Sequence, residues 1–164
     1  MGVSLDNLAE SLTYLEEQYV AAKQNTMPEM KLELVPVPVS DVDRAKGFYE
    51  KAGFELGVDT QMSDTMRVVQ FTPPGSACTI VFGTGMPGIS DMKPGSVHGL
   101  HLVVNDIDEA RQALTERGVE VDEVIDISQV KYAAFRDPDG NTWLLQEFPP
   151  AVRQPGQSFY QAQK

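Results

Sequence analysis

The sequence predicts an α+β fold built from two β-α-β-β-β modules that follow an N-terminal helix. Two observations support the pair of modules. Residues 39–56 (VSDVDRAKGFYEKAGFEL) return sixty-five positions later as residues 104–121 (VNDIDEARQALTERGVEV), with six identical positions. A turn containing proline and glycine also occurs twice at this spacing, as TPPG at 72–75 and as DPDG at 137–140. Such a repeat is typical of a copied folding unit, so we expect the two halves to share a core.

The first segment of the chain has the pattern of an amphipathic helix. Over residues 4–23, Ser4 can cap the N-terminus, and apolar side chains recur at alternating three- and four-residue steps. This narrow apolar stripe suits either a short coiled-coil seam or docking onto the chain's own domain. Pro28 ends the segment. We therefore expect a helix and linker at 1–28, a main domain at 29–150 and a polar tail at 151–164.

The same signals mark the helix and the strands in each module. Both helices have an aspartate at the N-terminus, Asp41 or Asp106, and a glycine at the C-terminus, Gly53 or Gly118. Alternating apolar residues and turn signals predict strands at 32–39, 54–59, 66–72 and 77–83, and again at 99–104, 119–125, 130–136 and 141–148.

Prolines and glycines refine this prediction. Pro36 and Pro38 lie in the first strand, and because proline cannot donate a ladder hydrogen bond, we expect an edge or bulged strand there. The turns at 72–75 and 137–140 both place proline second and glycine fourth, as a type I turn prefers.

Composition argues against several classes of partner. The net charge of -11 and the pI near 4.5 disfavour nucleic acids and anionic membranes, because both attract Lys and Arg. A cationic ligand would suit this charge. The single cysteine excludes an internal disulfide and a cysteine-rich zinc site. The sequence shows neither an apolar run of membrane-spanning length nor a signal-peptide pattern, so we expect a cytoplasmic protein.

Two motifs carry a family resemblance. With SDVDRAKGFYEKAGF in the first module and FRDPDGNTWLLQE at the end of the second, residues 31–148 resemble the vicinal oxygen chelate superfamily of glyoxalases, extradiol dioxygenases and bleomycin resistance proteins. The resemblance implies modules at 31–84 and 98–148, with mixed sheets curved around a concave pocket. Many members hold a divalent metal there with His, Glu or Gln from four strands. Because members differ in chemistry, the resemblance predicts the scaffold better than the activity.

The positions that correspond to those metal ligands hold unsuitable side chains. Seven residues before each capping aspartate stand Leu34 and Gly99, and four residues after each turn glycine stand Thr79 and Leu144. A divalent metal site needs imidazole nitrogen or carboxylate oxygen. The sequence therefore predicts no metal and no other cofactor, so that glyoxalase or dioxygenase chemistry would lack its Lewis acid.

Strand alternation assigns the remaining side chains to the pocket or to the core. The predicted ligand-binding residues are Leu34, Pro36, Thr79, Val81, Gly99, His101, Thr142, Leu144 and Gln146. This lining is mostly apolar, as in most small-molecule sites. His101 is the best candidate for a catalytic base or a ligand-orienting group, with a histidine satisfied by its polar neighbours as the equal alternative. Trp143 points to the other face, where we expect core packing.

These expectations favour a metal-free protein that binds a small organic molecule of cationic or aromatic character and sequesters it, as the bleomycin resistance proteins sequester a drug. One alternative is a lyase, an isomerase or a dioxygenase-like enzyme that uses His101 as general base or an unrecognised metal site. Another is an interaction module that binds its partner through the N-terminal helix. The resemblance also implies a homodimer, and the sequence leaves open whether modules pair within one chain or between two.

Overall fold

A computed structural model describes residues 16–18, 27–28 and 30–150 of the chain. Residues 1–31 and 32–164 form separate compact units. Of the predicted helix over 4–23, only residues 16–18 are described, and these are helical and exposed. The predicted tail at 151–164 lies outside the described residues. Among the residues that the structure describes, no helix combines the length and apolar character needed to cross a membrane.

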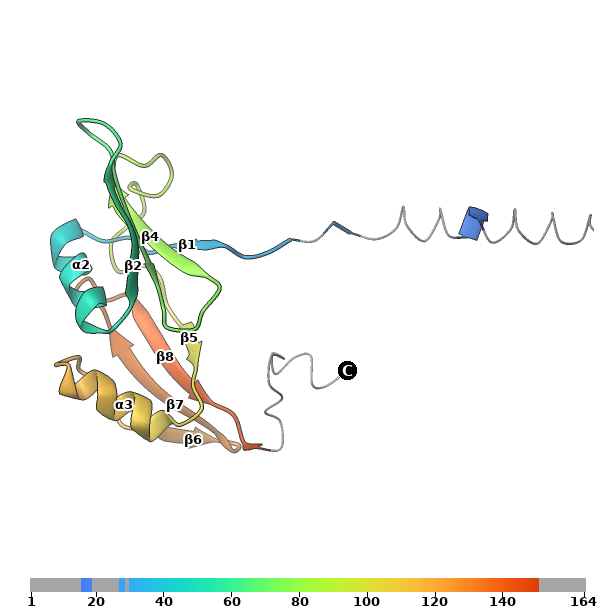
Figure 1. Cartoon of the computed structure of the whole chain (residues 1–164). Helices are drawn as coiled ribbons and strands as arrows, with labels where there is room; N and C mark the ends of the chain where they lie inside the picture. The colour runs from blue at the N-terminus through green and yellow to red at the C-terminus, as the bar shows by residue number, and fades with distance from the viewer. Residues whose placement is uncertain (1–15, 19–26, 29, 151–164) are drawn as a thin grey trace, which may run out of the picture. The chain divides into compact units, whose positions relative to one another are not determined.

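The second unit contains the two predicted modules (Figure 1). The first module consists of β1 (Leu34–Pro36), α2 (Val42–Lys51), β2 (Glu55–Gln61), β3 (Arg67–Thr72) and β4 (Thr79–Thr84). The second consists of β5 (Leu100–Val103), α3 (Ile107–Glu116), β6 (Ile125–Ile127), β7 (Val130–Arg136) and β8 (Thr142–Glu147). Their sheets have the orders β1-β4-β3-β2 and β5-β8-β7-β6, with β1 and β5 parallel to their neighbours and the other pairs antiparallel. This topology confirms the α+β prediction.

The sequence signals at the helix ends have the expected geometry. The Asp41 side chain accepts a hydrogen bond from the Arg44 backbone N–H at 2.9 Å, and Asp106 accepts one from Glu109 at the same distance. Gly53 and Gly118 have positive φ angles of 84° and 80°, a conformation that glycine adopts without steric cost. The predicted edge position of Pro36 is also confirmed, because β1 is the outer strand of its sheet.

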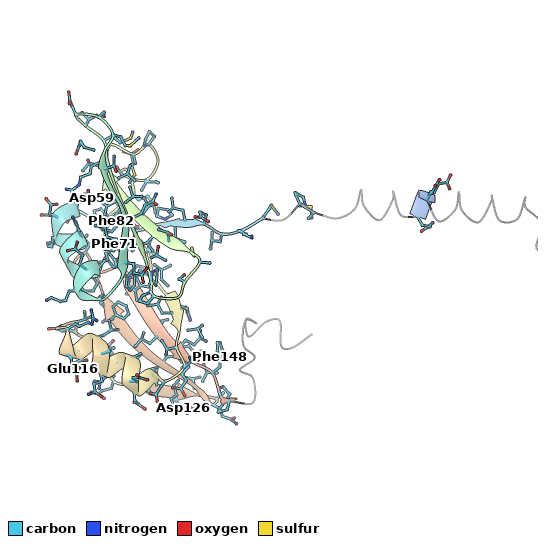
Figure 2. All side chains as sticks on the ribbon, viewed as in Figure 1. Asp59, Phe71, Phe82, Glu116, Asp126 and Phe148 are labelled. Atoms are coloured by element: carbon cyan, nitrogen blue, oxygen red, sulfur yellow. The ribbon has the colours of Figure 1, made fainter. Side chains whose placement is uncertain are left out.

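A single core lies between the helices and both sheets. Phe71 and Phe82, labelled in Figure 2, stack with ring centroids 6.0 Å apart beneath α2. Trp143 from β8 belongs to the same core and is 2% exposed, as predicted. Its ring packs edge-on against Phe54 of the first module at 5.3 Å. Each fully buried aromatic side chain of this kind stabilises the fold by about 1.5–3 kcal/mol, so the modules are stabilised together.

The structure corrects the assumed register of the fourth strands. Val35 pairs with Ile80 in the first module, whereas Leu100, sixty-five residues after Val35, pairs with Trp143, only sixty-three after Ile80. The second module therefore has two fewer residues between its helix and its fourth strand. Thr142, and not Leu144, occupies the place of Thr79. Because two is an even number, the side chains keep their predicted faces.

Two local predictions were wrong. The first turn closes one residue later than expected, through a 2.9 Å hydrogen bond from Ser76 N–H to Pro73 O, which puts Gly75, with its φ of 75°, at the third position. Positive φ at this position is a feature of type II turns and not of type I. The strand predicted at 119–125 is found at Ile125–Ile127. Upstream of it, the Asp122 carbonyl accepts a hydrogen bond from Arg111 Nε of α3 at 2.9 Å.

The β6–β7 hairpin contains strain that can be relieved. Ile127 pairs with Val130, and both residues between them, Ser128 and Gln129, have positive φ angles of 53° and 73°. A two-residue type I′ turn has this geometry and favours Asn-Gly. We expect the double substitution Ser128→Asn, Gln129→Gly to raise the free energy of unfolding by about 1 kcal/mol, measured by urea denaturation. Gln129→Ala, which leaves the strain in place, should give no gain, and an equal gain there would contradict this explanation.

Candidate functional site

The face of each sheet that points away from its helix carries the predicted ligand-binding residues. Alternate residues of the same strands, such as Ile80 and Leu145, belong to the core beneath the helices. In the first sheet Leu34 pairs with Thr79, and in the second His101 pairs with Leu144. We call these two faces the concave faces, after the surface expected from the sequence.

A polar group of three side chains lies on the concave face of the second sheet. His101 Nδ1 is 2.8 Å from Gln146 Oε1, and Gln146 Nε2 donates to the Tyr132 hydroxyl at 3.1 Å. The rings of His101 and Tyr132 are perpendicular, with centroids 6.2 Å apart. An amide oxygen can only accept, so His101 Nδ1 is the donor. This leaves His101 Nε2 as an acceptor and the Tyr132 hydroxyl hydrogen as a donor for a ligand.

Tyr132 is the member of this group that the sequence analysis missed. The strand predicted at 130–136 has the correct bounds, but none of the predicted ligand-binding residues lies in it. Tyr132 pairs with Gln146, and Gln146 pairs with Val103. Tyr132, Gln146 and Val103 therefore lie in one row across the sheet, on the same face. Counting alternate residues back from the turn would have identified it.

Apolar side chains surround this polar group and are open to solvent. Val103 is 66% exposed, Ile125 54% and Ile127 56%. On the first sheet, Leu34 is also exposed, while the Thr72 and Thr79 hydroxyl oxygens lie 3.2 Å apart. Exposed apolar side chains grouped on one face are typical of surfaces that bind a partner or a ligand.

The donor set of the concave faces does not fit a divalent metal. Within residues 16–18, 27–28 and 30–150, no three His, Cys, Asp or Glu side chains lie close enough to hold an ion. His101 is bonded to an amide, and the corrected register places Thr79 and Thr142 at equivalent positions. Neither register brings carboxylate or imidazole groups together, so these faces lack the donors that a divalent metal site needs.

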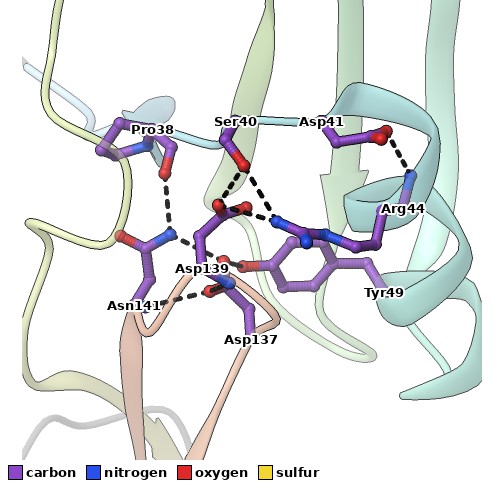
Figure 3. A network of polar contacts seen from close by, with 8 residues as sticks. All are labelled: Pro38, Ser40, Asp41, Arg44, Tyr49, Asp137, Asp139 and Asn141. Atoms are coloured by element: carbon purple, nitrogen blue, oxygen red, sulfur yellow. Dashed lines mark hydrogen bonds and ion pairs between the residues drawn. The ribbon is translucent and has the colours of Figure 1, made fainter.

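The turn at 137–140 joins the two modules through buried hydrogen bonds (Figure 3). Asp137 Oδ2 accepts from the Tyr49 hydroxyl of α2 at 2.9 Å and from Asn141 Nδ2 at 2.7 Å. Asn141 Nδ2 also donates to the Pro38 carbonyl at 2.9 Å. Burial raises the pKa of the Tyr49 hydroxyl, and the nearby Asp137 carboxylate raises it further, so Tyr49 stays protonated as a donor.

A second carboxylate strengthens the same junction. Asp139 Oδ1 accepts from Arg44 at 2.9 Å and also accepts a hydrogen bond from the Ser40 hydroxyl, both of which belong to the first module. From the sequence, residues 137–140 are predicted only to form a turn. The structure shows that the side chains of Asp137 and Asp139 also hold the modules together. The TPPG turn of the first module has no acidic residue, and this difference between the two copies could have indicated the role of Asp137 and Asp139.

A cavity of about 450 Å³ lies at another place between the modules. The first module contributes residues 52–54 and the turn at 73–76, and the second contributes residues 101–104, the inner face of α3 and Leu145. Of the nine predicted ligand-binding residues, only His101 lines this cavity. It is therefore distinct from most of the surface that the sequence analysis identified.

Comparisons with known proteins place these observations among relatives. The model of the Glyoxalase/Bleomycin resistance protein/Dioxygenase superfamily matches residues 31–145. TnmS3, an antibiotic binding protein from Streptomyces sp. CB03234, is 37% identical over 76% of this chain and 100% of its own, with a TM-score of 0.65. A glyoxalase/bleomycin resistance protein from the same strain is 40% identical over 70% of this chain and 98% of its own, with a TM-score of 0.59. A superfamily member from Sphaerobacter thermophilus DSM 20745 is 34% identical over 73% of this chain and 98% of its own, with a TM-score of 0.62. No curated protein shows significant similarity to the chain.

The junction can be tested by removing one hydroxyl group. We expect Tyr49→Phe to lower the free energy of unfolding by about 1–3 kcal/mol, because Asp137 loses a buried donor and Trp143 Nε1, 3.4 Å from the hydroxyl, loses its acceptor. Urea denaturation followed by the fluorescence of the single tryptophan measures this loss. Tyr132→Phe makes the same chemical change on the concave face and should cost less than about 0.5 kcal/mol. Equal losses of unfolding free energy in the two variants would show that the hydroxyl group at the junction stabilises the fold no more than the one on the concave face.

Proposed function

The chain belongs to the glyoxalase/bleomycin resistance protein/dioxygenase superfamily, and we propose that it is a metal-free member that binds a small organic molecule on its concave faces. The observation that carries this proposal is the polar group of His101, Gln146 and Tyr132 on an otherwise largely apolar, solvent-open sheet face. Small-molecule sites combine apolar walls with a few placed polar groups in this way.

Each part of the site has a distinct role in this proposal. His101 Nε2 accepts a hydrogen bond from the ligand, and the Tyr132 hydroxyl donates one, while Gln146 holds both side chains in place. The remaining predicted residues form the walls, and these are Leu34, Pro36, Thr79, Gly99, Thr142 and Leu144. Val81, also predicted to bind the ligand, is only 2% exposed and is not open to a ligand in this structure. The ligand therefore carries both a donor and an acceptor on an apolar, in part aromatic, body. The net charge of -11 would favour a cationic ligand.

A second copy of the chain completes the pocket in our proposal. A single sheet face provides one wall, and Val103, Ile125 and Ile127 remain open to solvent on it. Pairing of concave faces from two chains would cover these side chains and enclose the ligand. Burial of that apolar area would favour a homodimer.

The similarity to TnmS3 supports drug sequestration as the biological purpose. That protein is described as antibiotic binding and is 37% identical to this chain. Binding without chemical change needs neither a metal nor a nucleophile, which agrees with the donor set found here. Sequestration would lower the free concentration of a toxic molecule by mass action alone.

An enzyme that uses His101 as general base is the second candidate. The observation in its favour is that Nδ1 is anchored by Gln146 while the exposed ring leaves Nε2 free to take a proton. A lyase or isomerase could use such a base without a metal. The two candidates differ in whether the ligand leaves the protein unchanged.

A thermal-shift screen against antibiotics, aromatic metabolites and thiol adducts tests the proposal. A bound ligand at about 100 times its Kd should stabilise the protein by about 2.7 kcal/mol, and treatment with EDTA should leave this unchanged. Tyr132→Phe should weaken binding about three- to tenfold through loss of one hydrogen bond. Gln112→Ala, on the outer face of α3, is the matched control and should bind normally.

The state of the recovered ligand separates the two candidates. Mass spectrometry should return it unchanged, and a product whose formation requires His101 would establish the enzyme instead. Sedimentation analysis should show a dimer that Ile125→Glu weakens. Stoichiometric metal in the purified protein, or binding that Tyr132→Phe does not alter, would contradict the proposal.

A further inference from the structure

The duplication provides an internal comparison, because the contact between a helix of one module and the turn of the other occurs twice. At the contact between α2 and the turn at 137–140, Tyr49 is fully buried and bonded to Asp137. At the corresponding contact, between α3 and the turn at 73–76, the structure has the cavity of about 450 Å³. The cavity therefore occupies a place that protein atoms fill in the other half.

Side-chain size explains this difference. With the offset of sixty-five residues, Phe48 and Tyr49 of α2 correspond to Ala113 and Leu114 of α3. The rings of Phe48 and Tyr49 pack edge-on with centroids 5.3 Å apart, whereas Ala113 and Leu114 line the cavity. Replacement of two aromatic rings by smaller side chains leaves unfilled volume unless the backbone closes over it.

The turns differ in the same direction. At the filled junction, Asp137 and Asn141 form hydrogen bonds with the first module. The turn at 73–76 consists of Pro, Pro, Gly and Ser, so it has no side chain that can reach across in this way. Both sides of the second junction thus lack the groups that close the first.

The chemistry of the cavity indicates a class of ligand. Its walls include Phe54, Leu102, Leu114 and Leu145, and its volume lies in the range of roughly 300–1,000 Å³ that is usual for small-molecule sites. Arg117, at the end of α3, also lines it, and its guanidinium lies over Gly53, where an added Cβ would stand 3.2 Å from Nη1.

Arg117 has no ion-pair partner within the part of the chain that the structure describes. We propose that this cavity is a second ligand site, which shares only His101 and Val103 with the concave faces and binds a compact apolar molecule carrying one carboxylate. The apolar body enters between α3 and the first module, and the carboxylate pairs with Arg117. This assignment does not depend on the function proposed for the concave faces.

Binding of 2-naphthoate to the full-length protein tests the proposal, with the neutral 2-naphthamide as the companion probe. Isothermal titration should show one molecule of naphthoate bound per chain, about fivefold tighter than naphthamide, as expected of an exposed ion pair. Arg117→Gln should remove this preference and leave the affinity for naphthamide unchanged. Arg136→Gln, an exposed arginine outside the cavity, is the control and should keep the preference.

Cavity-filling variants locate the site. Ala113→Phe and Leu114→Tyr each restore a ring that α2 carries, and either should abolish binding of both probes while circular dichroism confirms folding. Gln112→Phe, a neighbour that does not line the cavity, should bind normally. Tyr132→Trp, which alters the concave face, should also bind both probes normally. The result for the cavity therefore stands even if the function proposed for the concave faces is wrong.

Four outcomes would overturn the inference. Naphthoate binding that survives Ala113→Phe and Leu114→Tyr would place the probe elsewhere. Binding that Tyr132→Trp abolishes would place it on the concave faces. Binding that appears only after deletion of residues 151–164 would show that the chain's own tail occupies the cavity. An Arg117→Gln variant that still prefers naphthoate would disprove the role of the guanidinium.

Discussion

The arrangement of the two modules depends on one buried carboxylate. Asp137 accepts hydrogen bonds from Tyr49 of the first module and from Asn141 of its own turn, and Asn141 in turn binds the Pro38 carbonyl. A buried charge is costly unless it is fully hydrogen-bonded, so the three partners and the carboxylate stabilise one relative position of the modules. That position sets where both concave faces lie.

The duplicated halves have diverged in a way that separates packing from binding. The helix-facing side of the first module is rich in large aromatic side chains such as Tyr49 and Phe82, which fill the core around Trp143. The second module has smaller residues on its helix and has its polar group, centred on Gln146, on the opposite face. One copy thus contributes most of the core aromatics, and the other offers open surface and an unfilled cavity.

The sequence predicts the fold well because its signals are local. Asp41, Asp106 and the helix-ending glycines specify both helices, and alternation assigns Trp143 to the core. The candidate site is predicted less completely, since its geometry depends on pairing between strands. The hydrogen bond between His101 and Gln146 requires knowledge of register, and the junction role of Asp137 requires contact between residues 88 positions apart. The spacing of residues within one copy reveals neither the register between strands nor the contacts between the two copies.

The difference of two residues between the copies has a consequence for how such a protein can change. The third strands, β3 and β7, already differ by one of these two residues, because Phe71 and Phe135, sixty-four positions apart, occupy the same place beside the fourth strand. Each single-residue difference therefore lies in a connection outside the paired strands, and the inward side chains stay inward. Length variation at these connections can come one residue at a time, because the loops take it up while the strands keep their faces.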